Sequence, residues 1–455
     1  MSKRHAIQIG TGSRGVVYRD AMAFQFPETV ELVGLCDVNP GRLALYQADL
    51  RARGREVPGV PPAELEALIR RQKADLVVVT SMDSTHDEYV IRALRAGCDV
   101  ICEKPLTTTA EKLTAIMAAI RETGREVRVT FNMRYAPVRM QVKRLLLEGV
   151  IGRVRSVEFR WLLNIRHGAD YFRRWHRNKA NSGGLLVHKA THHFDAVNWW
   201  IQDVPARVSA TGARLFYTPE QAERYGLTRR SERCRGCPEA CRCPFFLDLE
   251  HIPTLKAMYL DQEGYDGYFR DRCIFSSAMD IEDTVAATVE YRSGIRMSYG
   301  LTAFCPTEGY EIAFNGTKGR LEHGARESSS VFGGGETPGE VNGLTIRIWP
   351  HFGKPYAVTP EESRGSHGGG DDRLMKDLFS ANPGPDPLGL RADWRAGAWS
   401  ILTGIAANRA IRENRVVAIE DLVPDLPLPD YPPAPAWEAP IPLPADLSPA
   451  APAGR

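Results

Sequence analysis

The chain has 455 residues, of which 43% are hydrophobic and 25% are charged, and its 58 basic side chains nearly balance 56 acidic ones for a formal net charge of +2. This composition excludes collagen-like, disulfide-scaffold and wholly disordered proteins, and the length predicts two or three domains, because single cores stop growing near roughly 250–300 residues. The charge lacks the basic excess that binding to a phosphate backbone needs, so we expect a small-molecule ligand and no nucleic acid.

The chain carries no pattern typical of a membrane or secreted protein. No apolar run approaches the ~18–20 residues that span a bilayer, so we expect no membrane contact. A strand pattern at residues 6–9 follows the N-terminus at once and leaves no room for a cleaved signal, which predicts a cytoplasmic protein. Cys36, Cys98 and Cys102 lie within apolar strand patterns and are typical of reduced thiols.

Short β-rich runs alternate with amphipathic helix patterns in the first third of the chain. The runs lie at residues 6–9, 31–36, 75–80, 99–102 and 127–131. Continuous apolar strands bounded by helices at this spacing are typical of a parallel sheet that is covered on both faces. We therefore expect an α/β domain with a doubly wound parallel sheet over residues 1–135.

The pattern changes after Pro137. Residues 140–147 read as a helix, residues 154–163 as a strand, and residues 284–291 and 295–301 as two strands joined by a turn. In that hairpin apolar side chains alternate with polar or small ones, so we expect one face to be buried and the other to be exposed to solvent. We expect an α+β C-terminal domain with a large, mainly antiparallel sheet over residues 136–422.

Glycine and proline mark the expected loops and the end of the chain. Residues 332–339 and 365–370 are glycine-rich and predict loops. Because 11 of the 31 prolines fall within residues 424–452, residues 423–455 predict an extended, Pro-rich tail without helix or central strand. The alternatives for this tail are disorder and docking, on the protein or on a neighbouring subunit, through Leu426, Leu428, Tyr431, Trp437 and Ile441.

Residues 10–15, Gly-Thr-Gly-Ser-Arg-Gly, follow the first strand and open a helix pattern over residues 16–24. In G-x-G-x-x-G the first glycine permits the tight turn, the second lets the backbone approach a pyrophosphate, and the third allows close packing of helix on strand. Asp37 ends the second strand, where a carboxylate would accept hydrogen bonds from the adenosine ribose and repel a 2′-phosphate. The pattern predicts an NAD(P)-binding Rossmann domain that favours NAD over NADP, with Arg42 close enough to weaken that preference. The alternative is a tight turn with a helix-capping acid.

Lys104 is the first candidate for catalysis. It follows the strand at residues 99–102, and the carboxyl ends of strands near a topological switch point are where open α/β sheets bind ligands. The alternative is a surface lysine at a turn, which is what most lysines are.

A histidine block provides the second candidate. If the helix that ends near residue 200 includes residue 188, then His188 and His192 share a face, Asp195 lies beside His192, and His193 points elsewhere. Such a pair could bind a metal, but no third ligand accompanies it, and a base for proton transfer fits a dehydrogenase better. A packed, hydrogen-bonded helix histidine is the alternative.

Taken together, these motifs resemble the Gfo/Idh/MocA family, the relatives of glucose–fructose oxidoreductase and inositol dehydrogenase. The resemblance covers roughly residues 5–420 and rests on five segments, at residues 10–15, 85–86, 103–105, 132–135 and 183–195. It implies a Rossmann domain paired with a larger antiparallel-sheet domain, and oxidation of a sugar or polyol hydroxyl by NAD(P). It also implies a homodimer or homotetramer formed through that sheet.

The resemblance implies the site residues as well. Lys104 and His192 take the catalytic positions, and His188, also a catalytic candidate, stands where relatives usually carry Asp, which leaves the substrate and the direction open. The cofactor residues would be Gly10, Thr11, Gly12, Ser13, Arg14, Gly15, Asp37, Ser81, His86, Glu103, Lys104 and Asn132. The substrate contacts would be Lys104, Arg134, Tyr135, Trp175, His176, Arg177, His188 and His192, with ordinary domain packing as the alternative for the aromatic and arginine residues.

The leading hypothesis is an NAD-dependent sugar or polyol dehydrogenase. His192 would remove the hydroxyl proton, Lys104 would stabilise the oxygen, and hydride would pass to the nicotinamide. One alternative is a glycoside-cleaving enzyme that uses tightly bound NAD as a transient oxidant. Another is a non-catalytic NAD or sugar sensor.

Cysteines cluster in a polar, arginine-rich insertion at about residues 230–275. Four thiols lie within residues 234–243, and Cys273 follows. A C-x-x-C knuckle with two later cysteines is the ligand count of a tetrahedral structural zinc. A branch of the family that the chain resembles points to Cys234, Cys237, Cys243 and Cys273 as ligands, with Cys241 spare. A reduced cluster and a redox-sensitive disulfide are the alternatives.

Overall fold

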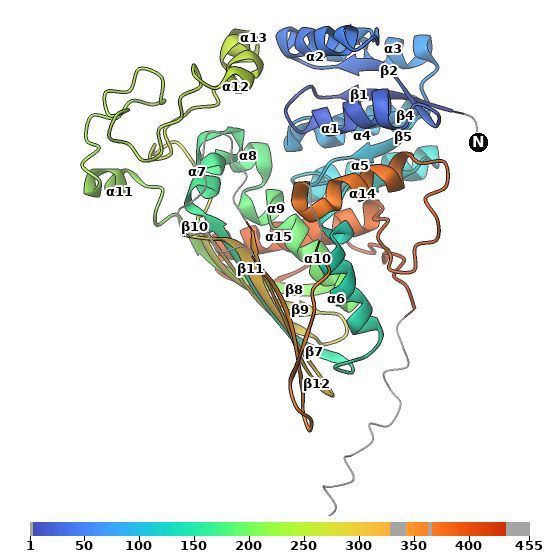
Figure 1. The fold of residues 1–455 in the computed structure, drawn as a ribbon, viewed down its shortest axis with the longest axis vertical. Helices are drawn as coiled ribbons and strands as arrows, with labels where there is room; N and C mark the ends of the chain where they lie inside the picture. Colours follow the sequence, from blue (N-terminus) through green and yellow to red (C-terminus); the bar gives the residue numbers. More distant parts are fainter. Residues whose placement is uncertain (1–2, 328–342, 363–365, 434–455) are drawn as a thin grey trace, which may run out of the picture.

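The computed structural model describes residues 3–327, 343–362 and 366–433. Its N-terminal part is a parallel sheet, blue to cyan in Figure 1. Within the described residues this sheet has six strands in the order β3-β2-β1-β4-β5-β6. They are β1 (Arg4–Ile9), β2 (Val30–Cys36), β3 (Gly59–Val60), β4 (Leu76–Val79), β5 (Asp99–Cys102) and β6 (Val127–Val129). The predicted doubly wound sheet is confirmed, and its strand order reverses between β1 and β4, where such sheets bind ligands.

Helices flank this sheet because its strands are apolar on both faces; all four residues of β4 are buried. The helices are α1 (Gly15–Asp20), α2 (Pro40–Ala52), α3 (Leu65–Gln72), α4 (His86–Arg95) and α5 (Ala110–Thr123), with short turns η2 (Pro62–Glu64) and η3 (Asp83–Thr85) between them. The helix predicted at residues 16–24 is α-helical only to Asp20 and continues as the π-helix η1 (Ala21–Gln25). No helix of the described chain is long and apolar enough to cross a bilayer.

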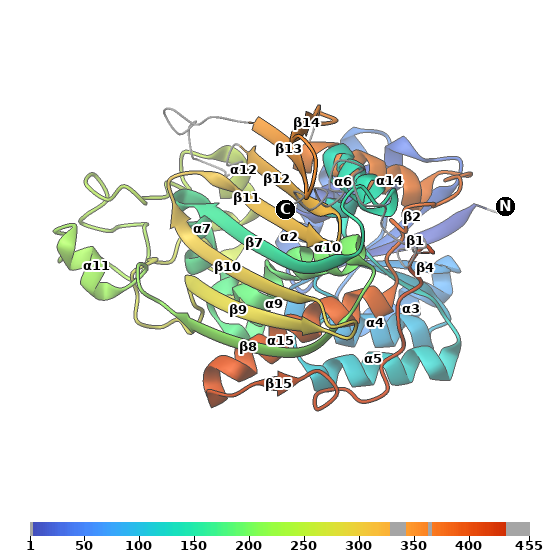
Figure 2. The same cartoon turned by 90° about the horizontal axis from the view of Figure 1, so that it is seen from below.

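The second sheet has nine strands in the described chain, in the order β14-β13-β12-β11-β7-β10-β9-β8-β15. They are β7 (Val154–Asn164), β8 (Pro205–Ala213), β9 (Thr284–Tyr291), β10 (Arg296–Cys305), β11 (Glu308–Gly316), β12 (Gly319–Glu327), β13 (Gly343–Pro350), β14 (Tyr356–Val358) and β15 (Val417–Ala418). Apart from the parallel pair β7 and β10, its ladders are antiparallel, as predicted. In the described part of the chain the helices lie on one face of this sheet, and the other face is open (Figure 2).

Helices fill the space between the two sheets. They are η4 (Asn132–Tyr135), α6 (Pro137–Leu147), α7 (Ile165–Arg173), η5 (Trp175–Arg177), α8 (Lys179–Ser182), α9 (Leu185–His188), α10 (Thr191–Ile201), α14 (Gly370–Phe379) and α15 (Trp394–Glu413). Helix α15 contacts β8 of the second sheet and β6 of the first. A Cβ at Gly397 would lie only 2.7 Å from a methyl group of Val129, so the glycine permits this close approach.

The cysteine-rich insertion extends from the second domain and reaches back to the Rossmann domain. It contains α12 (Pro253–Met258), η6 (Leu260–Gln262) and α13 (Glu263–Asp266), and α11 (Pro219–Arg224) precedes it. Figure 1 shows α12 and α13 next to α2. A small apolar cluster holds this part together and comprises Leu247, Leu249, Leu255, Tyr259 and Leu260.

The structure describes the second of the two predicted glycine-rich segments and the first part of the proline-rich tail. Residues 332–339 lie outside the described residues, but the loop predicted at residues 365–370 is a short 3₁₀ turn, η7 (Ser366–Gly369), that runs into α14. Gly368 and Gly369 have φ values of 64° and 76°, which glycine adopts without strain. Residues 423–433 have neither helix nor strand, as predicted, and they dock on the protein: Trp399 Nε1 donates to the carbonyl of Pro427 at 2.9 Å. Trp437 and Ile441 lie outside the described residues.

Candidate active site

The glycine loop follows β1, and its surroundings fit a dinucleotide. Gly10 has φ +92°, and a Cβ there would lie 2.6 Å from the backbone of Thr80. A Cβ at Gly15 would lie 2.5 Å from Gln8 Nε2, so helix and strand are closely packed. By contrast, a Cβ at Gly12 would meet only the Tyr259 hydroxyl, at 3.9 Å, which leaves room beside the loop for a pyrophosphate.

Asp37 is held at the end of β2 by the same loop. Its carboxylate accepts hydrogen bonds from Thr11 N at 2.6 Å, Thr11 Oγ1 at 2.8 Å and Asn39 N at 2.7 Å. Arg42 Nη2 lies 3.6 Å from Asp37 and also pairs with Asp266 of the insertion. The guanidinium that could have received a 2′-phosphate is therefore already engaged by two carboxylates.

Arg14 of the glycine loop forms one hydrogen-bond network with Glu103, Asp371 and Asn132. Arg14 Nε donates to Glu103 at 2.5 Å, and its two terminal nitrogens donate to Asp371 at 3.0 Å each. Asn132 Nδ2 donates to the same Asp371 at 2.8 Å, while its buried Oδ1 has no hydrogen-bond partner among the described residues. Burial opposes ionisation of Glu103, but Arg14 and Lys104 hold the pKa of Glu103 below its ordinary value. Because Asn132 Oδ1 has no partner among the described residues, it remains as an acceptor for a ligand.

The sequence pattern did not single out Asp371. It is the second residue of α14, so this network binds a C-terminal helix to the N-terminal glycine loop. The signal that could have found it is the triple glycine at residues 368–370, which we interpreted only as a loop.

Ser81 lies in the loop after β4, and His86 is the first residue of α4; together they position the neighbouring turn. His86 Nδ1 lies 2.7 Å from the Pro105 carbonyl, and Nε2 lies 3.2 Å from the Ser81 carbonyl. The ring is buried, and burial lowers the pKa of His86. His86 therefore links the loop after β4 to the turn that carries Lys104.

Lys104 lies two residues after the end of β5 and faces the second domain, where its Nζ donates to the carbonyl of His188 at 3.3 Å. Burial lowers the pKa of Lys104 to about 8, and the charges of Asp83 and Glu103 oppose that shift. An ammonium poised this close to neutral pH can hold or release a proton at a reacting oxygen.

Asp83 supplies a carboxyl group to His188. Its Oδ2 lies 2.6 Å from His188 Nδ1, and both side chains are buried. Burial raises the pKa of Asp83 and lowers the pKa of His188. Residue 188 is thus a histidine where relatives usually carry Asp, but Asp83 of the Rossmann domain supplies a carboxyl group beside it. Nothing in the sequence pattern singled out Asp83, although it follows β4 at the same sheet edge as Lys104.

His188 and His192 do not share a helix, because α9 ends at His188 and α10 begins at Thr191. The ring of the half-buried His192 lies edge-on to Phe131, with centroids 6.0 Å apart. Since Phe131 follows β6, this contact places His192 at the edge of the sheet that carries Lys104. His193 points away, as expected, and donates to or accepts from the Tyr299 hydroxyl at 2.8 Å.

Three expected substrate contacts lie buried within the protein instead. Asp195, which we expected beside His192, forms a two-pronged ion pair with Arg134, at 2.6 and 2.8 Å, and Arg134 is 2% exposed. The hydroxyl of Tyr135 donates to Asp377 at 2.9 Å. Arg177 is buried beside the insertion, where burial and then the charge of Arg272 lower its pKa. These surroundings fit the packing alternative.

Trp175 and His176 do lie with His188. Trp175 stacks on His176 at a centroid distance of 3.7 Å, and the rings of His176 and His188 are 4.2 Å apart. Tyr171 completes the cluster, 5.6 Å from His188. The half-buried indole of Trp175 lies 5.7 Å from the His188 ring and offers a flat apolar face suited to one side of a sugar ring.

The four cysteines expected to bind zinc line a common cavity, and Cys241 is exposed. Within the described chain, however, no group of three or more His, Cys, Asp or Glu side chains is placed to hold a metal ion. Burial raises the pKa of the Cys234, Cys243 and Cys273 thiols. All nine cysteines are described, and all are free.

Two family models of the Gfo/Idh/MocA type match this chain. The NAD-binding Rossmann fold of the oxidoreductase family matches residues 4–131, and the C-terminal alpha/beta domain of that family matches residues 143–419. The chain belongs to the Gfo/Idh/MocA family. This Gfo/Idh/MocA protein is therefore an oxidoreductase with an NAD-binding Rossmann domain, as predicted.

Known proteins agree with that assignment. The protein YteT of Bacillus subtilis (strain 168) is 36% identical over 410 residues, which cover 88% of this chain and 93% of YteT. Inositol 2-dehydrogenase of Rhizobium meliloti (strain 1021) is 30% identical over 208 residues, which cover 46% of this chain and 58% of that enzyme. The WlbA dehydrogenase of Bordetella pertussis, solved with NADH and UDP-GlcNAcA, has the same fold, with a TM-score of 0.61 at 19% identity over 92% of this chain and 99% of that chain.

Proposed function

We propose that this Gfo/Idh/MocA protein is an NAD-dependent dehydrogenase that oxidises a hydroxyl group of a sugar, polyol or sugar derivative. The observation that carries the proposal is Lys104, whose pKa burial lowers to about 8, at the sheet edge where the glycine loop also lies. The Asp83–His188 pair stands beside it, and the indole of Trp175 lies next to the His188 ring. Similarity to an inositol dehydrogenase supports a polyol or a sugar as substrate.

The protein's part in the reaction follows from these groups. Bound NAD would accept the hydride from the substrate carbon. His192 takes the proton of the reacting hydroxyl, and the Lys104 ammonium donates a hydrogen bond to the oxygen as negative charge develops there. Such a donor stabilises the transition state more than the ground state. His188, oriented by Asp83, hydrogen-bonds a second hydroxyl of the substrate.

The cofactor is NAD rather than NADP in this proposal. Asp37 stands where the ribose hydroxyls would lie, and the Arg42 guanidinium is engaged by Asp37 and Asp266. Titration of the purified protein with NADH and NADPH, followed by cofactor fluorescence, tests the preference.

Two further features belong to the proposal. The shared cavity of Cys234, Cys237, Cys243 and Cys273 supports a structural zinc, although the thiols as described are not placed to bind one. Protein purified under reducing conditions and without stoichiometric zinc would remove that part. A cytoplasmic location also stays a prediction, which fractionation of the source cells tests.

The reaction itself is tested with a panel of carbohydrates, by measuring NADH and product in the same sample. NADH formed together with an oxidised sugar supports the dehydrogenase. Cleavage of a glycoside without net NADH would instead show the transient-oxidation chemistry. Binding without either product would leave a sensor.

A further inference from the structure

The cysteine-rich insertion contacts the glycine loop directly. The backbone N–H of Ser13 donates to the Tyr259 hydroxyl at 3.1 Å, and the two hydroxyls of these residues lie 2.6 Å apart. Met258 Sδ accepts from Ser13 Oγ at 3.3 Å. Tyr259 is 6% exposed, so its ring is enclosed by the insertion while its hydroxyl meets the loop. The space beside Gly12, where a pyrophosphate would lie, is therefore bounded by Tyr259.

The insertion also covers the adenosine side of the site. Asn39 Nδ2 donates to the carbonyl of Gln262 at 3.0 Å, and Arg42 pairs with Asp266 at the end of α13. A Cβ at Gly41 would collide with the side chain of Gln262, so the two surfaces are in close contact. Because Asn39 and Gly41 lie just after Asp37, these contacts close over the expected ribose position.

Positive charge gathers behind Tyr259. The guanidinium of Arg270 lies over the Tyr259 ring, 5.3 Å from its centroid, and is 5% exposed. Arg270, Arg174 and Arg173 share the carboxylate of Asp170, at 3.4, 3.2 and 3.9 Å, so three guanidinium groups face one acid. The buried Nε of Arg270 has no hydrogen-bond partner among the described residues. An anionic pyrophosphate beside Tyr259 would complement this surplus charge.

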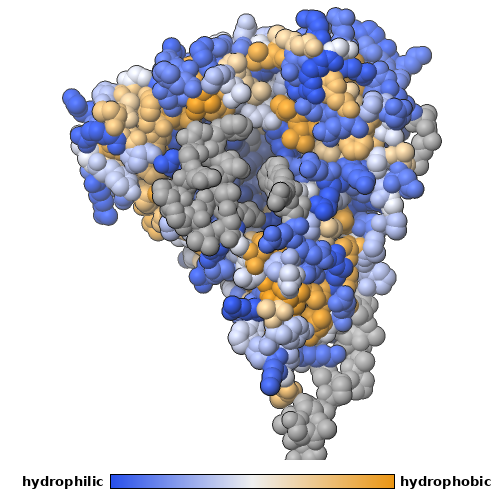
Figure 3. Space-filling model, viewed as in Figure 1, coloured by the Kyte–Doolittle hydropathy of each residue, from blue (hydrophilic) through white to orange (hydrophobic). Residues whose placement is uncertain are grey.

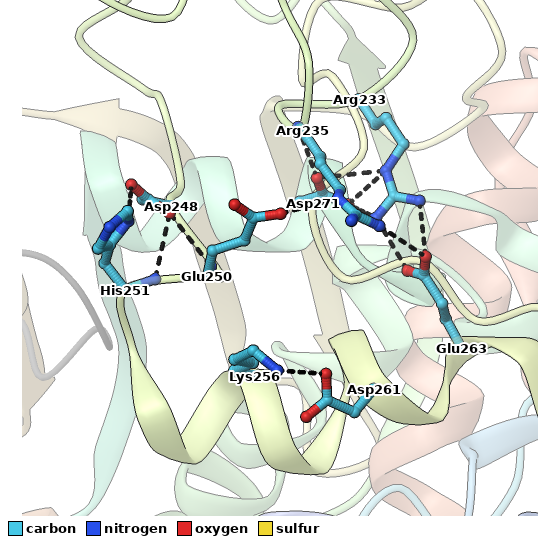
Figure 4. Close-up of polar contacts among 9 residues, drawn as sticks. All are labelled: Arg233, Arg235, Asp248, Glu250, His251, Lys256, Asp261, Glu263 and Asp271. Atoms are coloured by element: carbon cyan, nitrogen blue, oxygen red, sulfur yellow. Dashed lines mark hydrogen bonds and ion pairs between the residues drawn. The ribbon is translucent and has the colours of Figure 1, made fainter.

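The parts of the insertion are joined to one another (Figure 4). Arg233 donates to Glu263 at 3.0 and 2.8 Å and to Asp271 at 3.0 Å. Because Arg233 precedes Cys234, this network links the cysteine knuckle to α13, which carries Asp266. The knuckle and the segment over the cofactor site are thus expected to move together.

We propose that the insertion is the cover of the NAD site. On binding, the Tyr259 hydroxyl exchanges its contact with Ser13 for a hydrogen bond to a pyrophosphate oxygen, and the Arg42–Asp266 pair holds the cover over the adenosine half. Figure 3 shows a recess between the insertion and the Rossmann domain. The inference rests on the proposed function only in that NAD must bind. Its consequence is slow release of NAD, because the cover has to lift first.

The test measures how fast bound NADH leaves. NADH-loaded protein is mixed with excess NAD, and the loss of NADH fluorescence gives the dissociation rate. Tyr259→Phe should release NADH about fivefold faster, since one hydrogen bond is lost. Asp266→Asn should release it about threefold faster, since a half-buried ion pair is lost. Tyr225→Phe, which changes an exposed tyrosine near the insertion, is the matched control and should leave the rate unchanged.

A second measurement does not depend on these variants. The arginine-rich insertion offers many sites to trypsin, and NAD should slow its cleavage in the wild-type protein. Wild-type protein that binds NADH but shows no protection, or variants that release NADH at the wild-type rate while keeping the wild-type melting temperature, would overturn the cover. Wild-type protein that does not bind NADH at all would overturn the proposed function itself.

Discussion

At the scale of single residues, burial sets the protonation of the groups around the reacting oxygen. It lowers the pKa of Lys104 and His188 and raises the pKa of Asp83. The imidazole of His188 is therefore neutral at pH 7, while Lys104 is still mostly an ammonium. This leaves Lys104 as the positive donor next to the His188 carbonyl.

We expect the pH dependence of the reaction to report Lys104. Since burial depresses its pKa to about 8, the ammonium is present below that pH and is lost as the pH rises through it. The value of kcat/KM for alcohol oxidation should therefore fall above about pH 8. Lys104→Arg keeps its charge and should be less active but without this fall. An unchanged alkaline limb in Lys104→Arg would assign the limb to another group.

Removal of either candidate catalytic side chain should separate chemistry from cofactor binding. Lys104→Ala and His192→Ala are each expected to lower kcat about 10²–10³-fold, because a proton acceptor or a charged donor is lost. NADH titration should show binding close to that of the wild type. Near-normal turnover in either variant would contradict its assignment.

At the scale of elements, the short helices α9 and α10 have different anchors. A Cβ at Gly404 would collide with the Leu186 carbonyl, so α15 lies directly on α9. Asp195 instead ties α10 to η4 through Arg134. The two anchors direct His188 and His192 separately, which a single helix would not allow.

The Arg134–Asp195 pair should matter for stability rather than for substrate binding. Arg134→Met leaves a buried carboxylate without its partner and should lower the free energy of unfolding by about 3–5 kcal/mol. Urea unfolding followed by circular dichroism measures the change, and Arg134→Met with Asp195→Leu should recover much of it. A raised KM with unchanged stability would restore Arg134 as a substrate contact.

At the scale of the whole molecule, the open face of the second sheet stands out. Alternate residues of β9 and β10, among them Ala286, Thr288 and Ser298, are exposed on it, while the other face is buried under helices. A second copy of the chain could cover this face by two-fold symmetry.

We therefore propose a homodimer or homotetramer formed through the second sheet. Light scattering on the purified protein should give two or four copies, and Ala286→Arg combined with Ser298→Arg should give a monomer that still binds NADH. An oligomer unaffected by the two arginines would place the interface elsewhere, and a monomeric wild type would remove it.

Local patterns in the sequence were sufficient to predict the individual strands and the glycine loop. The strands predicted at residues 99–102 and 284–291 match β5 and β9, because the period of apolar residues reports which faces are buried. The glycine loop, Asp37 and Lys104 could be placed because each follows a recognisable strand, and parallel strands end at one edge of a sheet.

The pairs of side chains that meet across the fold could not be read from local patterns. Asp83 and His188 are 105 residues apart, Ser13 and Tyr259 are 246 apart, and Arg14 and Asp371 are 357 apart. Local periodicity shows that a residue faces inward, but it carries no record of the partner that packing brings against it. The carboxyl group beside His188 and the insertion over the glycine loop therefore depend on how the two domains pack.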